Sequence, residues 1–323
     1  MKHLLLLAAA LVFITGCSQR QYFEPEDTQD FHKSSSNLGS DIKAFNRDGA
    51  TLENGKIITQ KGILDKALPE GFEFLNVSEG KVIATNNKDK ILIDGEEIEL
   101  GDVIIGATIK DNMLALIHSN NAISLIDLTD KKTVFKEYLE KSYANDIRIA
   151  NPHFMSNIVL FPTLNGKVTV VSLQNYKVVR NITVDADGRF NNIIFLKVVN
   201  DTLVTATANK IISVGDGVLN IKEYEIRDVI SHENDIYIAT IDGQIIQTDI
   251  SLNVMNRNKY QFAKIYALAY GDSLYALESQ GYLINISEDF KTDTIYDFSF
   301  DEEEDVIAID DTIYFGNEYI KLK

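Results

Sequence analysis

The chain repeats one unit of short β-strands, and residues 157–184 show this unit most clearly. Residues Ile158–Phe161 form a short apolar run, which is typical of an inner strand buried on both faces. Asn165–Gly166 then provides a hairpin turn that accepts positive φ angles. The β-branched run Val168–Leu173 predicts a second buried strand, and the mixed run Lys177–Val184 predicts a half-exposed outer strand. With one short strand before them, these three strands make a four-stranded propeller blade.

Seven further copies of the unit occur along the chain. From Leu114 to Ile313, equivalent inner-strand positions lie 33 to 45 residues apart, which is the period of a propeller. One such sheet cannot bury both faces alone, so the copies must stack around an axis. We therefore predict an all-β protein whose domain, residues 49–323, is a β-propeller of eight four-stranded blades. The other copies begin at Asn54, Lys81, Asn112, Asp201, Asp235, Asp272 and Asp311.

The sequence leaves three details of the ring open. The first copy is compressed, because Ile57 and Val82 are only 25 residues apart, so seven blades are an alternative. Residues 131–145 combine helical spacing of apolar side chains with a position in the repeat that requires an outer strand. The last copy ends after three strands, and we expect a segment between Ile42 and Leu52 to supply its fourth strand.

Residues 1–16 have the features of a cleaved export signal. Lys2 precedes eleven apolar residues, Leu4–Ile14, which are too few to span a bilayer as a helix. The ending Ile14-Thr15-Gly16-Cys17 resembles the bacterial lipobox, in which the cysteine becomes the lipidated first residue; the alternative is a signal that merely contains a cysteine. Cys17 is the only cysteine, so no intramolecular disulfide can form. Ser18, by resemblance to Gram-negative lipoproteins, favours delivery to the outer membrane.

Residues 17–48 contain few apolar side chains, and we expect them to form a flexible tether after the lipidated cysteine. About 30 such residues have a root-mean-square reach of roughly 30 Å, so the globular part would stand off the membrane.

The net charge of −17 excludes one class of function. Such a surface repels the phosphates of nucleic acids and anionic lipid headgroups, so we expect no nucleic-acid partner and membrane contact through the lipid alone. The acidic run Asp301–Asp305 suggests either a site for a divalent cation or basic partner, or a solvated loop.

The sequence shows no catalytic or metal-binding set. Histidines 32, 118, 153 and 232 are scattered and lack metal-ligand spacing. The segment Asp185–Gly188 looks like the start of a calcium loop, but Leu196 stands where a bidentate glutamate is needed. No G-x-S-x-G motif occurs. We therefore predict a protein that is not an enzyme and holds no metal or cofactor.

The lipobox, the tether and blades of this form together resemble the BamB family of outer-membrane lipoproteins, which are eight-bladed propellers of the quinoprotein-like (PQQ-like) repeat type. The resemblance covers nearly the whole mature chain. It implies an accessory role in the machine that assembles β-barrel proteins, with the periplasmic domains of its central barrel protein as the partner. The absence of tryptophan argues against the quinoprotein enzymes, whose repeats are rich in tryptophan.

Two loops match positions that the family uses for its partner. Ile147 and Arg148 stand a few residues before Pro152, and Asp185 and Asp187 lead into the next blade. The resemblance therefore implies partner binding by Ile147, Arg148, Asp185 and Asp187. The family's loop has a Leu-x-Leu-Arg order, which residues 146–149 do not reproduce. The alternatives are a surface ion pair for Arg148 and a solvated turn for the two aspartates.

The function predicted from the sequence is a non-catalytic, lipid-anchored scaffold of the outer membrane that faces the periplasm and takes part in barrel assembly. One alternative is a propeller hydrolase or lyase acting on an envelope polymer through carboxylates such as Asp242 or Glu278. Another is a lipoprotein that binds a different envelope partner, for example in adhesion.

Overall fold

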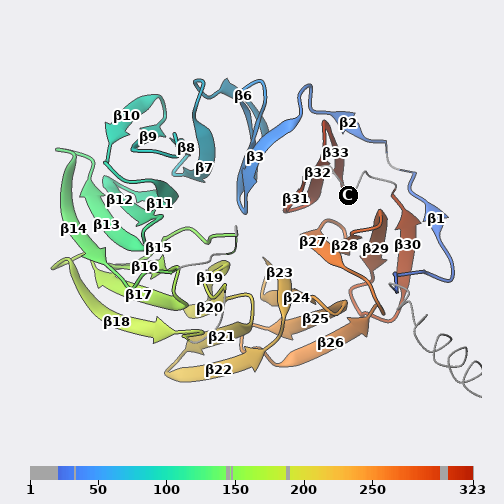
Figure 1. Cartoon of the computed structure of the whole chain (residues 1–323). Coiled ribbons are helices and arrows are strands. Elements are labelled where there is room, and N and C mark those ends of the chain that lie inside the picture. Colours follow the sequence, from blue (N-terminus) through green and yellow to red (C-terminus); the bar gives the residue numbers. More distant parts are fainter. Residues whose placement is uncertain are drawn as a thin grey trace, which may run out of the picture.

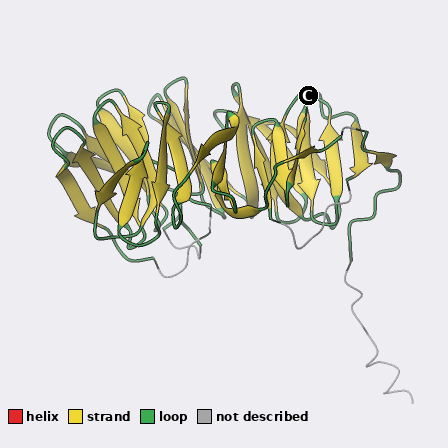
Figure 2. Cartoon of the chain, turned by 90° about the horizontal axis from the view of Figure 1, so that it is seen from above, coloured by secondary structure: helices red, strands yellow, loops and turns green. Residues whose placement is uncertain are grey.

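The computed structural model describes residues 21–32, 34–142, 146, 148–186, 190–298 and 305–322. All regular secondary structure within these ranges is β-strand, and the strands form eight sheets arranged in a ring (Figure 1). The prediction of an eight-bladed propeller is thus confirmed, and the seven-bladed alternative is wrong. Seen from the side, the ring is a disc with its turns and loops on two faces (Figure 2).

Each blade runs from an inner strand beside the axis to an outer strand on the rim. Blade 1 consists of β3 (Ile42–Asn46), β4 (Gly49–Leu52), β5 (Lys56–Thr59) and β6 (Gly62–Ala67), and blade 2 of β7 (Glu73–Ser78), β8 (Lys81–Thr85), β9 (Lys90–Ile93) and β10 (Glu96–Glu99). Blade 3 consists of β11 (Ile104–Lys110), β12 (Met113–His118), β13 (Ala122–Asp127) and β14 (Lys132–Tyr138). Blade 4 consists of β15 (His153–Met155), β16 (Ile158–Pro162), β17 (Lys167–Ser172) and β18 (Lys177–Thr183).

The other four blades follow in chain order, and the last two each include a strand from the N-terminal segment. Blade 5 consists of β19 (Phe195–Val199), β20 (Thr202–Ala206), β21 (Lys210–Gly215) and β22 (Val218–Glu223), and blade 6 of β23 (Ile226–His232), β24 (Asp235–Thr240), β25 (Gln244–Asp249) and β26 (Val254–Lys259). Blade 7 consists of β27 (Ile265–Tyr270), β28 (Leu274–Glu278), β29 (Tyr282–Ile286) and β30 (Asp293–Asp297), with β1 (Gln29–Asp30) beside β30. Blade 8 consists of β31 (Val306–Ile309), β32 (Thr312–Phe315) and β33 (Glu318–Lys321), with β2 (Ser36–Asn37) beside β33.

Blade 4 matches the predicted unit strand by strand. The turn between β16 and β17 contains Gly166 with a φ of 75°. A Cβ atom at this position would meet the carbonyl oxygen of Asp185 at 1.8 Å, so only glycine fits. Residues 132–138 form the outer strand β14, so the repeat position and not the helical spacing decides the structure there.

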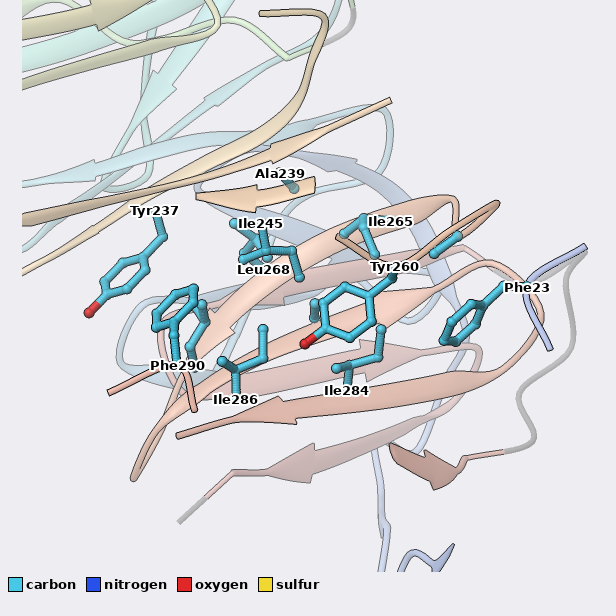
Figure 3. Packing of buried hydrophobic residues seen from close by; sticks show 13 residues of the cluster. Phe23, Tyr237, Ala239, Ile245, Tyr260, Ile265, Leu268, Ile284, Ile286 and Phe290 are labelled. Atoms are coloured by element: carbon cyan, nitrogen blue, oxygen red, sulfur yellow. The ribbon is translucent and has the colours of Figure 1, made fainter. Parts of the chain in front are cut away.

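The hydrophobic core lies between neighbouring blades. Figure 3 shows one such cluster, in which Tyr237 and Ile245 of blade 6 pack against Leu268 and Ile284 of blade 7. Each buried Leu or Ile side chain stabilises the fold by about 1.5–3 kcal/mol, so the inter-blade layers hold the ring together.

The ring closes in a different place from the one predicted. The fourth strand of blade 8 is β2, which pairs antiparallel with β33, whereas residues 42–52 form the inner strands β3 and β4 of blade 1. The backbone N–H groups of Leu38 and Ile42 donate to Asn317 and Gly316 at 2.7 and 3.3 Å and continue this seam.

Much of the range predicted as a flexible tether lies against the ring. We call residues 21–32 and 34–38 the strap. Its strand β1 adds to blade 7 in parallel beside β30. Phe23 is 6% exposed and packs edge-to-face on Tyr260, with ring centroids 6.2 Å apart (Figure 3). It also packs edge-to-face on Tyr282, with ring centroids 5.7 Å apart. Phe31 makes the same kind of contact with the rings of Tyr296 and Phe298. Two isolated aromatic residues thus fix a segment whose overall composition is polar.

No helix in the described part of the chain is long and apolar enough to cross a membrane. Cys17 and the acidic residues 301–304 lie outside the described residues.

Candidate protein-binding site at the centre of the ring

The β3–β4 hairpin of blade 1 is short, and its turn lies near the ring axis (Figure 1). The side chain of Asn46 fixes the turn, because its Nδ2 donates to the carbonyl oxygens of Phe74 and Leu75 at 2.9 and 3.0 Å. Its Oδ1 accepts the backbone N–H of Asp48 at 2.8 Å. A Cβ atom on Gly49 would meet the carbonyl oxygen of Ile58 at 2.2 Å, so the hairpin packs tightly against its own blade.

Arg47 extends from this turn to the far side of the ring. Its Nη2 donates to the carbonyl oxygen of Val229 on β23, and its Nη1 lies 3.6 Å from Oδ1 of Asp228. The guanidinium also stacks 5.1 Å from the ring centroid of Phe195 at the start of β19. Asp228 in turn accepts the backbone N–H of Leu268 at 2.9 Å. One side chain of blade 1 therefore contacts blades 5 and 6, and through Asp228 it is linked to blade 7.

Asp48 makes a second contact across the centre. Its Oδ2 accepts a hydrogen bond of 2.6 Å from Nδ2 of Asn151, whose own Oδ1 accepts the backbone N–H of Ala107 at 2.8 Å. Burial raises the pKa of Asp48 above its ordinary value, although neighbouring Arg47 and the bond from Asn151 act in the opposite direction. The centre of the ring is therefore a network of polar side chains.

Arg148 lies at the edge of this network. Its Nε donates to Oδ1 of Asp146 at 2.8 Å, one Nη bonds the same carboxylate, and the other donates to the carbonyl oxygen of Arg227. Burial opposes ionisation of Asp146, but the bonds from Arg148 lower its pKa below the ordinary value. The side chain of Arg148 is 21% exposed and holds its loop to blade 6, which agrees with the ion-pair interpretation. Ile147 lies outside the described residues.

Asp185 is a buried residue and not part of a solvated turn. It is 4% exposed, accepts a 3.2 Å hydrogen bond from Nδ2 of Asn209, and lies 3.8 Å from Nζ of Lys210. Adjacent asparagines connect the two predicted loops: Asn191 donates to the Asp185 carbonyl at 2.9 Å, and Asn192 donates to the Arg148 carbonyl at 3.1 Å. Asp187 lies outside the described residues.

Beside this network lies a cavity of about 210 Å³ between blades 1, 2 and 3 and residues 149–151. Phe74 and Ile104 are among its buried apolar lining, while Phe45 on β3 is 38% exposed beside them. Glu73 and Asn87, joined by a 2.6 Å hydrogen bond, supply polar groups. Sequence reasoning missed Phe45, because only the register of β3 shows that this aromatic ring lies in the cavity.

The carboxylates of the enzyme alternative do not line this cavity. Asp242 lies in the β24–β25 turn; burial alone would raise its pKa, but hydrogen bonds from Lys259, Thr240 and Gln244 bring the pKa down to about 2. Glu278 is fully buried and accepts the backbone N–H groups of Lys264 and Gln280 at 3.0 and 2.7 Å. Each carboxylate thus stabilises a turn of its own blade.

Blade 3 contains a serine, a histidine and an aspartate in a row, which the sequence did not reveal. Nε2 of His118 lies 2.8 Å from Oγ of Ser124, and its Nδ1 lies 3.3 Å from Oδ2 of Asp102. Both Ser124 and His118 are only 2% exposed, so the serine hydroxyl has no access to a substrate. Burial, with a contribution from Lys136, lowers the pKa of His118 to about 4. This row therefore joins the segment before β11 to β12 and β13 of the same blade.

Nowhere in the described ranges do three His, Cys, Asp or Glu side chains gather closely enough to hold a metal ion. The site consists of a polar centre, a small half-apolar cavity and one exposed aromatic ring. Such an arrangement suits the binding of another macromolecule's side chains.

Comparison with known proteins supports the fold and gives one named relative. No protein-family model matches the chain. The plasminogen-binding protein PgbB of Helicobacter pylori, in strains J99 and 26695, is 30% identical over alignments that cover 93% of this chain. The chain spans 66% of the length of these relatives.

Solved structures resemble the chain at lower identity. BamB from Moraxella catarrhalis matches with a TM-score of 0.65 at 14% identity, over 88% of this chain and 98% of that structure. The WD40 domain of Sif2 matches with a TM-score of 0.62 at 8% identity, over 90% and 98%. The resemblance to the BamB-type propeller is thus confirmed at the level of the fold.

Proposed function

We propose that this protein is a lipid-anchored scaffold of the outer membrane that faces the periplasm and binds a protein partner through the centre of the ring. The observation that carries the proposal is Phe45, a 38% exposed aromatic ring beside a cavity of about 210 Å³. Aromatic residues next to desolvated pockets commonly provide most of the binding energy of an interface. Arg148 and Asp146 hold the neighbouring loop and so shape the edge of this central site.

The partner that we propose is the periplasmic part of the central barrel-assembly protein. The supporting observations are the BamB-like fold and the lipobox with Ser18 after Cys17. In this proposal Ile147 and Asp187 contact the partner directly, while Arg148 and Asp185 hold the loops that carry them. Residues 1–16 are removed and Cys17 carries the lipid.

The strap limits how far the ring can lie from the membrane. Six residue steps separate Cys17 from Phe23, which is bound to blade 7. A fully extended chain spans at most about 3.6 Å per residue, so Phe23 stays within about 22 Å of the lipidated cysteine. The scaffold therefore lies close to the membrane surface and does not swing on a long tether.

An affinity pull-down from detergent-solubilised envelopes tests the partner. The tagged, lipidated protein is compared with Phe45→Ser and with Ile241→Ser, an exposed apolar residue (58%) on a turn that does not line the cavity. We expect the wild type and Ile241→Ser to recover the barrel-assembly protein and Phe45→Ser to recover about tenfold less. Equal recovery by all three proteins, or none by the wild type, would contradict the proposal. Arg148→Glu is a poorer probe, because it would place like charges beside Asp146.

The lipid anchor has its own test. Metabolic labelling with a radioactive fatty acid should mark the wild type and leave Cys17→Ser unlabelled. A wild-type protein without label would remove the anchor from the proposal and leave the central binding site in place.

A second candidate function is binding of plasminogen, which the name of the Helicobacter pylori relative favours. Purified plasminogen can be passed over the immobilised protein and the binding followed by surface plasmon resonance. Saturable binding that Phe45→Ser weakens would place plasminogen at the same centre. Absence of binding would restrict that activity to the relative.

A further inference from the structure

Three neighbouring outer strands expose apolar side chains on the rim of the disc. We call β18, β22 and β26 the rim strip; they follow one another along the edge of blades 4, 5 and 6 (Figure 1). On β22, Val218, Leu219 and Ile221 are 56, 52 and 52% exposed. On β26, Met255 is 52% exposed. Apolar residues on an edge strand are usually covered or replaced by charges, because a bare edge invites another strand.

The rim strip is basic although the whole chain carries a net charge of −17. The three strands contain five basic side chains and one acidic side chain. The outer strand of blade 2, β10, has the opposite character, with the sequence Glu-Glu-Ile-Glu. The basic residues of the strip are Lys177, Arg180, Lys222, Arg257 and Lys259, of which Lys259 is already paired with Asp242. An acidic partner is therefore attracted to this part of the rim and repelled from blade 2.

The chain itself shows that a blade edge of this ring accepts an extra strand. The strap adds β1 to blade 7 with Gln29 opposite Tyr296 and Asp30 opposite Asp297. The surrounding strap sequence is acidic and contains Glu24, Glu26 and Asp27. Within the described residues no strand pairs with the outer edge of β22, so its outward N–H and C=O groups have the geometry that β30 offers to β1.

We propose that the outer edge of β22 binds an extended acidic segment of a partner protein by strand addition. Main-chain hydrogen bonds to β22 contribute affinity that does not depend on the sequence of the segment. Alternate apolar side chains of the segment pack on Leu219 and Ile221. The basic side chains of the rim strip select acidic residues at the remaining positions. This surface lies on the rim, whereas the proposed central site lies at the axis, so the two sites are independent.

A labelled peptide measures this binding directly. The probe is a seven-residue capped peptide that alternates glutamate with valine, and its matched control has lysine in place of glutamate. Fluorescence anisotropy with the purified protein should show saturable binding of the acidic peptide and at least about tenfold weaker binding of the basic one. Hydrogen exchange should slow at the amides of residues 218–223 when the acidic peptide is bound.

Two variants complete the test. Leu219→Glu combined with Ile221→Glu adds two negative charges at exposed positions, and we expect it to weaken binding of the acidic peptide about tenfold or more. Ile241→Glu adds a charge to another exposed apolar site and should bind as the wild type does. Unchanged thermal unfolding of the double variant shows that the ring is intact.

The proposal is overturned by equal binding of both peptides, by protection that maps away from β22, or by a double variant that binds like the wild type. Vesicles of anionic lipid provide the remaining comparison. Suppose that the wild type binds these vesicles but not the acidic peptide, and that the double variant no longer binds the vesicles. The rim strip would then be a lipid-binding surface, and strand addition would be wrong.

Discussion

Arg47 of blade 1 donates a hydrogen bond to the main-chain carbonyl of Val229 in blade 6, so the two blades are joined across the axis of the ring. Propeller blades normally contact only their neighbours through apolar layers, and this bond adds a connection between two blades that are not neighbours in the ring. The position of the β3–β4 turn makes this bond possible, because the turn lies near the axis (Figure 1) and brings Arg47 within reach of β23.

Replacing Arg47 with methionine should destabilise the protein by about 1–3 kcal/mol. The variant leaves the Val229 carbonyl without its donor and removes the positive partner of Asp228, while most of the apolar stem remains. Urea unfolding followed by circular dichroism measures the change. Arg180→Met, on an exposed outer strand, is the control and should cost about 0.5 kcal/mol or less. Equal stability of the two variants would show that the cross-ring bond has no net effect.

Asp48→Asn should make the protein more stable than the wild type at pH 7. Because burial raises the Asp48 pKa in the folded state, the native protein binds more protons there than the unfolded chain does. The wild type therefore loses stability as the pH rises from the ordinary aspartate value through the raised one. The asparagine retains an oxygen that accepts the bond from Asn151.

Unfolding curves at pH 3 and pH 7 measure this effect, and the advantage of Asp48→Asn should disappear near pH 3. Asp216→Asn, on an exposed turn, is the matched control. A variant that is less stable than the wild type at pH 7 would mean that Arg47 and Asn151 outweigh the cost of burial.

His118 should make the stability depend on pH in the opposite direction. Its pKa is about 4 in the folded protein against an ordinary value of 6.5, so below pH 6.5 the unfolded chain binds the proton more readily. The stability from the neutral histidine is fully present above pH 6.5 and is lost as the pH falls toward 4. The shift corresponds to about 3 kcal/mol. Urea midpoints at pH 7, 5.5 and 4.5 measure the loss.

His118→Gln should flatten this part of the pH profile, and His32→Gln, on the exposed part of the strap, should leave it unchanged. A profile that is equally steep in His118→Gln would assign the acid sensitivity to other groups.

Phe23→Ser should release the strap and leave the ring folded. The substitution removes both edge-to-face contacts, with Tyr260 and Tyr282, and exposes their rings. Hydrogen exchange at residues 21–32 should become much faster, while the amides of β27 and β28 keep their protection. Tyr22→Ser changes an adjacent but 48% exposed residue and should have little effect. Unchanged protection of the strap in Phe23→Ser would show that β1 alone holds it.

The blades could be predicted from the sequence because each buries the same pattern of apolar residues. Residues 158–184 carry two apolar runs, a glycine turn between them and a half-exposed outer strand, and the three strands reappear as β16, β17 and β18. The ring closure could not be predicted in detail, since β1 and β2 are two residues long and show no periodicity. Their pairing is supported by Phe23, Phe31 and Leu38, which are apolar residues in a largely polar segment.

Less of the candidate site than of the fold could be predicted from the sequence. An ion pair between Asp146 and Arg148 is local and follows from their spacing, but the bond from Arg148 to the Arg227 carbonyl depends on ring geometry. The same holds for Phe45, whose exposure beside the cavity follows from the register of β3. Contacts between residues that are far apart in the chain are set by how the blades stack, and no short sequence pattern encodes this.

The strap determines the route that a mechanical force takes through the molecule. Tension on the chain ahead of Gln21 meets the aromatic contacts of Phe23 and then the short parallel pairing of β1 with β30. Only after these yield does the load reach β2, whose two residues close the last blade. The part of the strap before β2 therefore protects the two-residue pairing that closes blade 8 from a force that pulls on the N-terminal side.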